Sequence, residues 1–236
     1  MPLKLTKNFA LLYGIMLGDG CLSLVYGKKK YIAIAGSMQD DVPFFDNVVR
    51  PIIKTLISKD IPIKFKRGEG SIQLNFVKHS LFDFISSFGF PIGKKGNRLF
   101  IPKIFYNKRL VKYVIRGFFA TDGSLVLTDN NGTLYPRVEA NGIAKNLIEE
   151  IGVFLNSKGI NCKFYEAKRK HHHYPNTKPA YRLQMNGKEN LKKLTQTYYA
   201  IAIRNFLKYL IKNDYEVLSP DKIELPKIPR RQIEII

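Results

Sequence analysis

Two stretches of the chain have the hydrophobic pattern of a buried helix and end in the same polar signature. Residues 12–20 read LYGIMLGDG and residues 115–123 read IRGFFATDG, so both fit G-x-x-x-[GT]-D-G. Each pattern predicts an apolar helix closed by a glycine in the left-handed conformation. An anion in the last turn, here Asp19 and Asp122, meets the negative end of the helix dipole and costs about 0.3 to 1 kcal/mol. A bound cation is the simplest compensation.

The elements predicted after both helices follow the same order. Alternating apolar positions favour strands and a 3.6-residue period favours helices. After the first motif these patterns indicate strands at 21–24 and 31–36, a helix from about 44 to 59, strands at 61–65 and 71–76, and a helix at 80–88. After the second they indicate strands at 124–127 and 135–141, a helix from about 147 to 158, strands at 160–164 and 182–186, and a helix at 189–196.

We therefore predict an α+β protein that is a tandem repeat of two α-β-β-α-β-β-α halves with antiparallel sheets. The first half covers residues 1–88 and the second covers 108–218, which includes an additional helix from about 198 to 212. Residues 89–107 are turn-rich and basic and are interpreted as the linker. Residues 219–236 contain three prolines and are interpreted as a tail of unknown role.

The same alternation predicts which strand residues face solvent. In the first half, Ile61, Ile63 and Phe65 are expected inside, and the outward set is Lys64, Lys66, Ser71, Gln73 and Asn75. The outward set of the second half is Tyr135, Arg137, Glu139, Lys163, Tyr165, Arg182, Gln184 and Asn186. Arg and Lys suit guanine edges in a DNA major groove, and Gln and Asn suit adenine. An ordinary solvated sheet face is the alternative interpretation.

Composition supports a polyanionic partner. The 236 residues include 39 Lys and Arg against 19 Asp and Glu, a net charge of +20, which favours nucleic acid over a membrane patch. Basic turns and loops are expected to contact phosphates; these are Lys28, Lys29, Lys30, Lys94, Lys95, Lys168, Arg169 and Lys170. No apolar run reaches the roughly 18 residues that span a bilayer, and the N-terminus lacks a signal-peptide pattern. We expect an intracellular protein, cytoplasmic or organellar, with no membrane partner.

Cysteine and histidine do not indicate a metal site of their own. Cys21 and Cys162 are too few for a disulfide framework or a thiolate zinc site, and small buried hydrophobic residues are the favoured interpretation. Residues 171–173 are consecutive histidines on a predicted basic loop. Adjacent side chains on an extended loop point in different directions, so an exposed loop near a polyanion explains them better than chelation.

The chain resembles the monomeric LAGLIDADG homing endonucleases over residues 8–212, because both nine-residue motifs end in Asp-Gly and the same elements follow each. The resemblance implies that the two motif helices pack along a pseudo-twofold axis, with Gly14, Gly18, Gly117 and Thr121 allowing close approach. It also implies that the sheets form a saddle for double-stranded DNA. Asp19 and Asp122, with Gly18 and Thr121, would hold two or three Mg²⁺ ions, and a single chain would make a staggered double-strand break in a long asymmetric site.

The resemblance also suggests polar or basic groups around the metals. The positions we would test are Ser37 and Asn141, at corresponding ends of the second strands, and Lys78 and Lys188, just after the fourth strands. A freestanding, intron-encoded nuclease is the favoured reading. Two alternatives use the same basic surface: an RNA-binding intron maturase, and a cleavage-dead DNA-binding regulator. The intact aspartates argue against the regulator and leave the maturase open.

Overall fold

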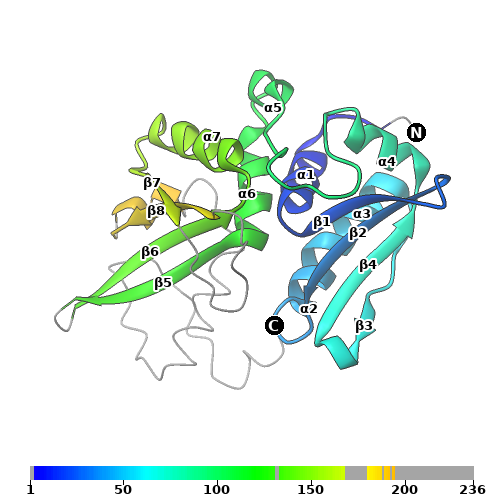
Figure 1. The fold of residues 1–236 in the computed structure, drawn as a ribbon, viewed down its shortest axis with the longest axis horizontal. Coiled ribbons are helices and arrows are strands. Elements are labelled where there is room, and N and C mark those ends of the chain that lie inside the picture. Colours follow the sequence, from blue (N-terminus) through cyan, green and yellow to red (C-terminus); the bar gives the residue numbers. More distant parts are fainter. Residues whose placement is uncertain (1–2, 131–132, 168–179, 188, 192, 195–236) are drawn as a thin grey trace.

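The computed structural model describes residues 3–130, 133–167, 180–187, 189–191 and 193–194. Two helices lie side by side at the centre, α1 (Lys7–Asp19) and α6 (Val111–Asp122). A four-stranded antiparallel sheet extends from each of them, so the sheets spread out on either side of the helix pair (Figure 1). The predicted α+β repeat is confirmed.

In the first half the elements after α1 are β1 (Gly20–Val25), β2 (Lys29–Ser37), α2 (Val42–Phe44), the π-helix η1 (Phe45–Val49), α3 (Arg50–Ile57), β3 (Lys64–Lys66), the 3₁₀ helix η2 (Arg67–Glu69), β4 (Ser71–Val77) and α4 (His79–Ser86). In the second half, α5 (Lys103–Asn107) precedes α6, which is followed by β5 (Gly123–Asn130), β6 (Thr133–Gly142), α7 (Lys145–Asn156), β7 (Lys163–Ala167) and β8 (Ala180–Asn186). The strand orders, β1-β2-β4-β3 and β5-β6-β8-β7, are equivalent.

The described part of the last predicted repeat helix is also helical, at residues 189–191 and 193–194. The helix predicted at 198–212, the tail at 219–236 and the histidines at 171–173 lie outside the described residues. Within the described ranges, no helix combines the length and apolar character that crossing a bilayer requires.

The backbones of α1 and α6 touch where each helix carries a glycine. A Cβ on Gly14 would lie 1.9 Å from the Val114 carbonyl oxygen, and one on Gly117 would lie 2.2 Å from the Leu11 carbonyl oxygen. No side chain fits at either point, because the obstacle is the backbone of the neighbouring helix. The side chains around this contact are apolar and buried, so the helix pair is also the core between the two halves.

The glycines that end the motif helices are not left-handed, and that prediction is wrong. Gly20 has φ −86° and ψ 158°, and Gly123 has φ −85° and ψ 147°, which are extended values that any residue adopts. Glycine is needed there for space: a Cβ on Gly20 would lie 2.4 Å from Met16 Cα, and one on Gly123 would lie 2.4 Å from the Phe119 carbonyl oxygen. The chain therefore turns straight from helix into strand, which keeps each aspartate beside the first strand of its sheet.

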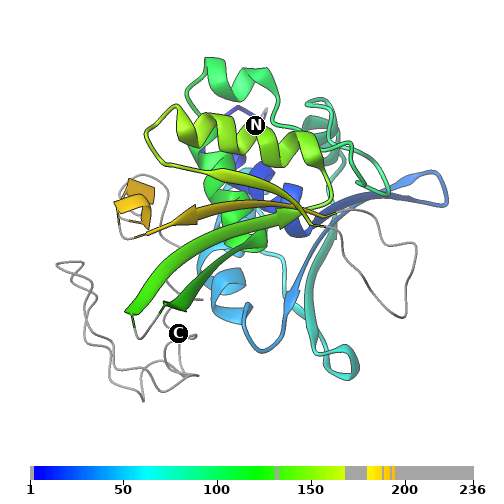
Figure 2. The ribbon, with the colours of Figure 1, turned by 60° about the vertical axis from the view of Figure 1, so that its left-hand side comes forward.

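Each sheet has one face in the core and one face away from it. Ile32, Ile34 and Leu74 form part of the buried face of the first sheet. In the second half α7 packs along β6, β7 and β8 (Figure 2). The segment between the halves also enters the core, since Ile101 and Phe105 are fully buried and Ile92 forms a parallel bridge to Leu22 of β1.

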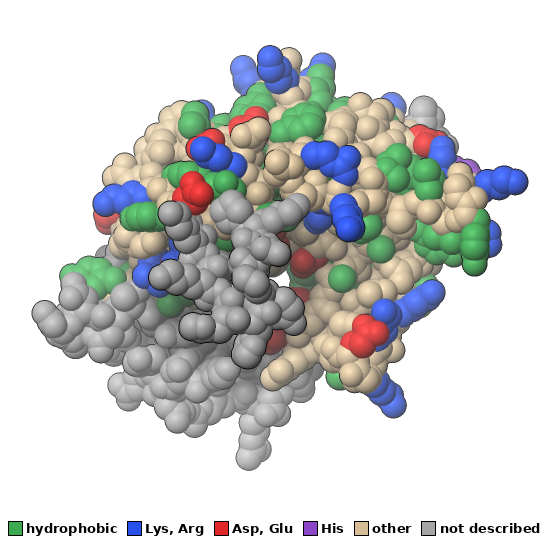
Figure 3. All heavy atoms as spheres, viewed as in Figure 1, with side chains coloured by type: hydrophobic (Ala, Val, Ile, Leu, Met, Phe, Trp, Pro, Cys, Tyr) green, Lys and Arg blue, Asp and Glu red, His purple; other side chains and the backbone are tan. Residues whose placement is uncertain are grey.

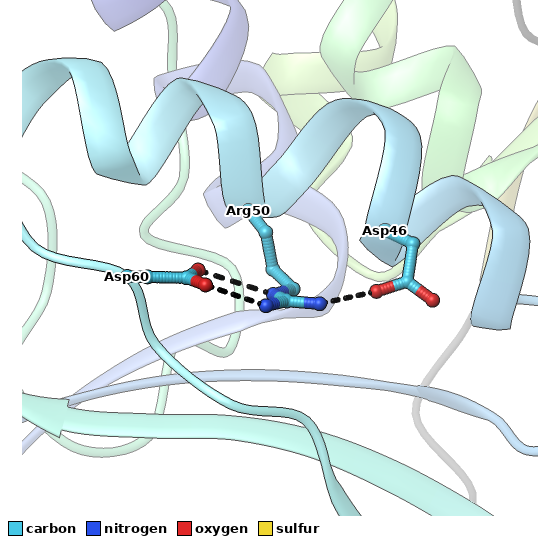
Figure 4. A network of polar contacts seen from close by, with 3 residues as sticks. All are labelled: Asp46, Arg50 and Asp60. Carbon is cyan, nitrogen blue, oxygen red and sulfur yellow. Dashed lines mark hydrogen bonds and ion pairs between the residues drawn. The ribbon is translucent and has the colours of Figure 1, made fainter.

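The helix predicted from about 44 to 59 is instead three short helical segments in a row, α2, η1 and α3. Pro51 lies in the first turn of α3 and has no N–H to continue an α-helical ladder, so a wider π turn precedes it. Arg50 donates to Asp46 at 2.6 Å and to Asp60 at 2.7 and 3.3 Å (Figure 4). These contacts tie the helix to the segment that leads into β3, although exposed ion pairs of this kind contribute little energy.

The third strands begin later than predicted. β3 starts at Lys64 and β7 starts at Lys163, so Ile61 is buried ahead of its strand. Phe65 pairs with Ile72 and shares its core-side face, yet 52% of Phe65 is exposed. β3 is a three-residue edge strand with a neighbour on one side only, so its side chain is poorly covered.

The contact at Gly14 predicts a large effect from one methyl group. Alanine should favour an isolated helix by about 1 kcal/mol, but in Gly14→Ala the methyl group meets a backbone carbonyl that cannot rotate away. We expect the free energy of unfolding, measured by urea denaturation, to fall by about 2–3 kcal/mol. Gly68→Ala is the control, because an added Cβ there would meet nothing within 4 Å beyond its own chain neighbours, and it should change stability by less than about 0.5 kcal/mol. Unchanged stability in Gly14→Ala would contradict the observed helix contact.

Candidate functional site

The close contact of α1 and α6 brings the two motif aspartates to one place. Asp19 and Asp122 are the last residues of their helices. A Cβ on Gly18 would lie 1.9 Å from Thr121 Oγ1 and 3.1 Å from Asp122 Oδ1, so the end of α1 lies directly against the end of α6. In the space-filling view, acidic side chains gather in the hollow between the halves (Figure 3). The four residues predicted to allow close approach are therefore in contact.

Both carboxyl groups hold their protons more tightly than free aspartate does. The pKa of Asp122 is raised to about 7, first by burial and then by the charge of Asp19, while the charge of Lys95 opposes the shift. The pKa of Asp19 is also raised, first by burial and then by the charge of Asp41, again opposed by Lys95. The Asp19 side chain still reaches solvent. The charge of Asp19 disfavours ionisation of Asp122, and a bound cation would relieve that repulsion.

A lysine from the segment between the halves lies at this place. The Lys95 ammonium donates to the carbonyl oxygens of Leu17 at 3.0 Å and Met16 at 3.4 Å, and it also donates to the carbonyl of Gly18. These carbonyls belong to the last turn of α1, where a helix leaves carbonyl oxygens without a full set of intrahelical hydrogen bonds. They form the negative end of the helix dipole. Burial lowers the pKa of Lys95, and Asp122 and Asp19 oppose that shift. The sequence predicted that Lys95 contacts phosphates, whereas here its ammonium is bound to carbonyl oxygens of α1.

Asp41 is a second residue of the site that the sequence did not indicate. Its Oδ2 accepts from the Ser37 amide at 2.8 Å, and its charge acts on Asp19. The Ser37 hydroxyl accepts from the Asp40 amide at 3.3 Å, so it serves the turn after β2. Neither Lys95 nor Asp41 belongs to a motif or a periodic segment. For Asp41, the two acids that follow Ser37 were the feature of the sequence that could have indicated a place in the site.

The residues present suit a hard divalent cation. Asp19 and Asp122 offer carboxylate oxygens, and Gly18 and Thr121 offer backbone carbonyl oxygens, which are the donors that Mg²⁺ and Ca²⁺ prefer. The Lys95 ammonium shows that the Gly18 carbonyl already attracts a cation. Among the described residues, no group of three or more His, Cys, Asp or Glu side chains could hold a metal alone. Water and ligand oxygens would have to complete the coordination, as Mg²⁺ usually requires.

The strand registers place the predicted outward residues on shared faces. Lys64 pairs with Gln73, which pairs with Ala35; Lys163 pairs with Gln184, which pairs with Glu139. Directly paired residues share a face, and the neighbouring positions Ile34, Leu74, Val138 and Leu183 are buried in the core. The outward face therefore carries Lys64, Lys66, Ser71, Gln73 and Asn75 in one sheet and Tyr135, Arg137, Glu139, Lys163, Tyr165, Arg182, Gln184 and Asn186 in the other.

The two halves differ in what lies beside each aspartate. Gly20 pairs with Ile34 and Gly123 pairs with Ala140, so the counterpart of Asn141 is Ala35. Ser37 lies two residues farther along β2, and its predicted correspondence with Asn141 is wrong. The two Gln-x-Asn segments are also not at equivalent places in their sheets. Gln73 pairs with Ala35, the counterpart of Asn141, whereas Gln184 pairs with Glu139. In both copies the Gln and Asn side chains bond to each other, at 2.8 and 2.9 Å.

Glu139 is on the predicted face but is not exposed. It is 6% exposed and pairs with Arg137 Nε at 2.6 Å and Arg182 Nε at 3.7 Å. Arg182 also donates from Nε to Asn141 Oδ1 at 3.1 Å. A carboxylate in this position cannot reach a base edge, because two arginines enclose it. Glu139 was expected to be exposed on this face, and the structure instead buries it in ion pairs with the two arginines.

Other predicted positions separate from the aspartates. Leu74 pairs with Ile34, which in turn pairs with Gly20 beside Asp19. Lys78 lies four residues beyond Leu74, about 13 Å along the strand direction. Lys78 is thus at the far end of β4 from Asp19. Lys30 pairs with Asp83, while Lys28 and Lys29 are exposed at the hairpin turn. Lys168, Arg169, Lys170 and Lys188 lie outside the described residues.

Comparison with known proteins agrees with this architecture. A family model described as a LAGLIDADG-like domain matches residues 110–198. The homing endonuclease I-DmoI, in a complex with DNA and Ca, matches 81% of this chain and 88% of its own with TM-score 0.56 and 19% identity. The chain has the two-domain LAGLIDADG fold.

Other proteins with the LAGLIDADG fold align as widely. The meganuclease I-AabMI, bound to uncleaved DNA, matches 89% of this chain and 93% of its own with TM-score 0.52 and 13% identity. The homing endonuclease I-LtrWI, bound to its target DNA, matches 89% and 90% with TM-score 0.54 and 10% identity. At these identities the likeness concerns the fold.

A curated relative is much longer than this chain. The uncharacterized protein MJ1054 of Methanocaldococcus jannaschii is 27% identical over 202 residues, which is 83% of this chain and 21% of that protein. The chain therefore spans about a fifth of the length of the curated relative it matches.

The raised pKa of Asp122 predicts a pH-dependent penalty in the metal-free protein. The folded state binds this proton more tightly than the unfolded state, so stability is lost as pH rises from about 4 towards the folded pKa of about 7. In EDTA, Asp122→Asn should therefore melt at a higher temperature than the unsubstituted protein at pH 8, and the difference should vanish near pH 4. The measurement is thermal unfolding across pH. An Asn variant that is less stable at pH 8 would contradict the raised pKa of Asp122.

Proposed function

We propose that this protein is a site-specific DNA endonuclease that cuts both strands of a long, asymmetric duplex by divalent-metal-dependent hydrolysis. The single observation that carries the proposal is the meeting of Asp19 and Asp122 at one end of α1 and α6, with raised pKa values. Two paired anions destabilise a protein unless something binds them. A pure DNA-binding protein would gain nothing from anions beside phosphates.

The sheets supply the surface that would receive DNA. Their outward faces carry Lys, Arg, Gln and Asn on both sides of the aspartates, and the whole chain has a net charge of +20. An antiparallel sheet can read base edges in the major groove, while lysines hold phosphates. The faces are not identical, which fits an asymmetric target. Because one chain provides both aspartates, we propose that it acts as a monomer.

Asp19 and Asp122 would hold the divalent ions, with the carbonyl oxygens of Gly18 and Thr121 as further donors. When bound, such ions neutralise developing charge on phosphate and make water a better nucleophile. Each aspartate would serve one strand of the duplex. Asn141 and Arg182 lie on the outward face of the second sheet and would orient groups near Asp122, whereas Ala35 leaves the corresponding place near Asp19 without a polar side chain.

Removing either carboxylate should separate binding from cleavage. Asp19→Asn or Asp122→Asn should abolish double-strand cleavage and leave duplex affinity within about tenfold, because the substitution removes a metal donor without touching the sheets. The substrate is obtained by selecting cleaved duplexes from a randomised library with Mg²⁺, with Ca²⁺ run in parallel. Cleavage is followed on gels and affinity by fluorescence anisotropy.

Asp46→Asn is the matched control, since Asp46 is an exposed aspartate paired with Arg50 on a helix. It should cut as well as the unsubstituted protein. Full double-strand activity in either motif variant would remove the assigned roles. Tight binding of duplex with no cleavage by the unsubstituted protein would point to a DNA-binding regulator.

The sheet lysines should act on phosphates rather than on base choice. Lys64→Ala and Lys163→Ala should each weaken binding to all duplexes and reduce the slope of log affinity against log salt by about 0.9. Both side chains are exposed on the outward faces. Lys54→Ala, an exposed lysine on α3, is the control and should leave the slope unchanged. An unchanged slope in the sheet variants would move these lysines off the phosphate backbone.

A further inference from the structure

We propose that Lys95 is a tethered cation that occupies the α1 side of the metal site and must leave it before the Gly18 carbonyl can bind a divalent ion. This inference rests on the proposed function for its biological meaning, although its test needs no DNA. It makes the two motif helices unequal. The side that ends in Asp122 is the one that accepts an ion first.

The contacts of Lys95 use its whole hydrogen-bonding capacity. An ammonium group has three N–H donors, and three successive carbonyls of α1, those of Met16, Leu17 and Gly18, lie within bonding distance. The carboxylates therefore act on Lys95 through space. The positive charge is stabilised by the carboxylates of Asp122 and Asp19 and lies at the negative end of a helix, a combination that would also attract a divalent ion.

The tether is built into the fold. Ile92 bridges Leu22 of β1, and the Gly93 amide donates to the Leu22 carbonyl at 2.7 Å. These bonds hold the chain just before Lys95 against the strand that follows Asp19. Lys95 lies in the single segment that joins the two halves, so this lysine has no counterpart in a repeated position. Its hydrogen bonds go to α1. Lys95 and Asp122 also line a cavity of about 510 Å³ with Leu99, Ile143 and Ile148, which provides space beside the ammonium.

The direct test is Mn²⁺ binding by the metal-free full-length chain, measured from the free-ion signal in electron paramagnetic resonance. Lys95→Gln keeps hydrogen-bond donors but removes the charge, and Lys95→Met removes both. Each should bind Mn²⁺ about tenfold more tightly or more, because the competing charge is gone. Lys94→Met is the control, since Lys94 is exposed, and it should bind within about twofold of the unsubstituted protein.

A double substitution locates the effect. Asp19→Asn should reduce Mn²⁺ affinity strongly in the Lys95→Gln background and weakly in the original chain, because Lys95 masks the α1 side in the latter. Equal losses in the two backgrounds would overturn the proposal.

Thermal unfolding separates competition from simple support of the helix end. In EDTA, Lys95→Gln and Lys95→Met should melt at lower temperature, and Mn²⁺ should recover more of that loss than it adds to the original chain. If Mn²⁺ binds the variants no better than the original, or recovers nothing, Lys95 is a helix cap only and the proposal fails. Cleavage is not part of these readouts, so an inactive protein with the expected Mn²⁺ behaviour would overturn the nuclease and retain the competition.

Discussion

The close contact between α1 and α6 is the constraint on which the rest of the molecule depends. Gly14 and Gly117 let the two backbones touch, and each lies five residues before an aspartate. Because the helices pack with pseudo-twofold symmetry, equal spacing brings both aspartates to the same end. The repulsion between them is a direct result of packing that is otherwise favourable, since the helices bury apolar side chains along the rest of their length.

The two halves have similar backbones but different side chains at equivalent positions. The sheets have the same order, and the glycines after both aspartates have nearly the same dihedral angles. Beside them, however, Ala35 stands where the other half has Asn141. In the second sheet, two arginines also form ion pairs with buried Glu139. In the first half, Lys95 donates hydrogen bonds to the end of α1. A symmetric frame can therefore present two different surfaces.

The sequence was sufficient for features that depend on local periodicity. Alternation in the strands correctly assigned Lys64, Gln73, Lys163 and Gln184 to the outward faces, because one core-facing side specifies register strongly. It failed where longer-range packing decides. Phe65 follows the alternation but lacks a covering neighbour, and Ser37 was aligned with Asn141 although cross-strand pairing puts Ala35 there. Gly20 looked like a left-handed cap, whereas its lack of a Cβ matters for contact with Met16.

The least predictable part of the site is also the part that decides its electrostatics. A net charge of +20 suggests that any acid in this chain is well neutralised, but mobile ions screen charges over about 8 Å at physiological salt. The described lysines of the sheet faces are not among the charges that act on Asp19 and Asp122. Within the described residues, burial and the charge of Asp19 raise the pKa of Asp122, and the charge of Lys95 opposes that shift. Overall charge governs encounter with a polyanion, whereas the protonation state of the aspartates depends on burial, on neighbouring carboxylates and on one ammonium group in direct contact with α1.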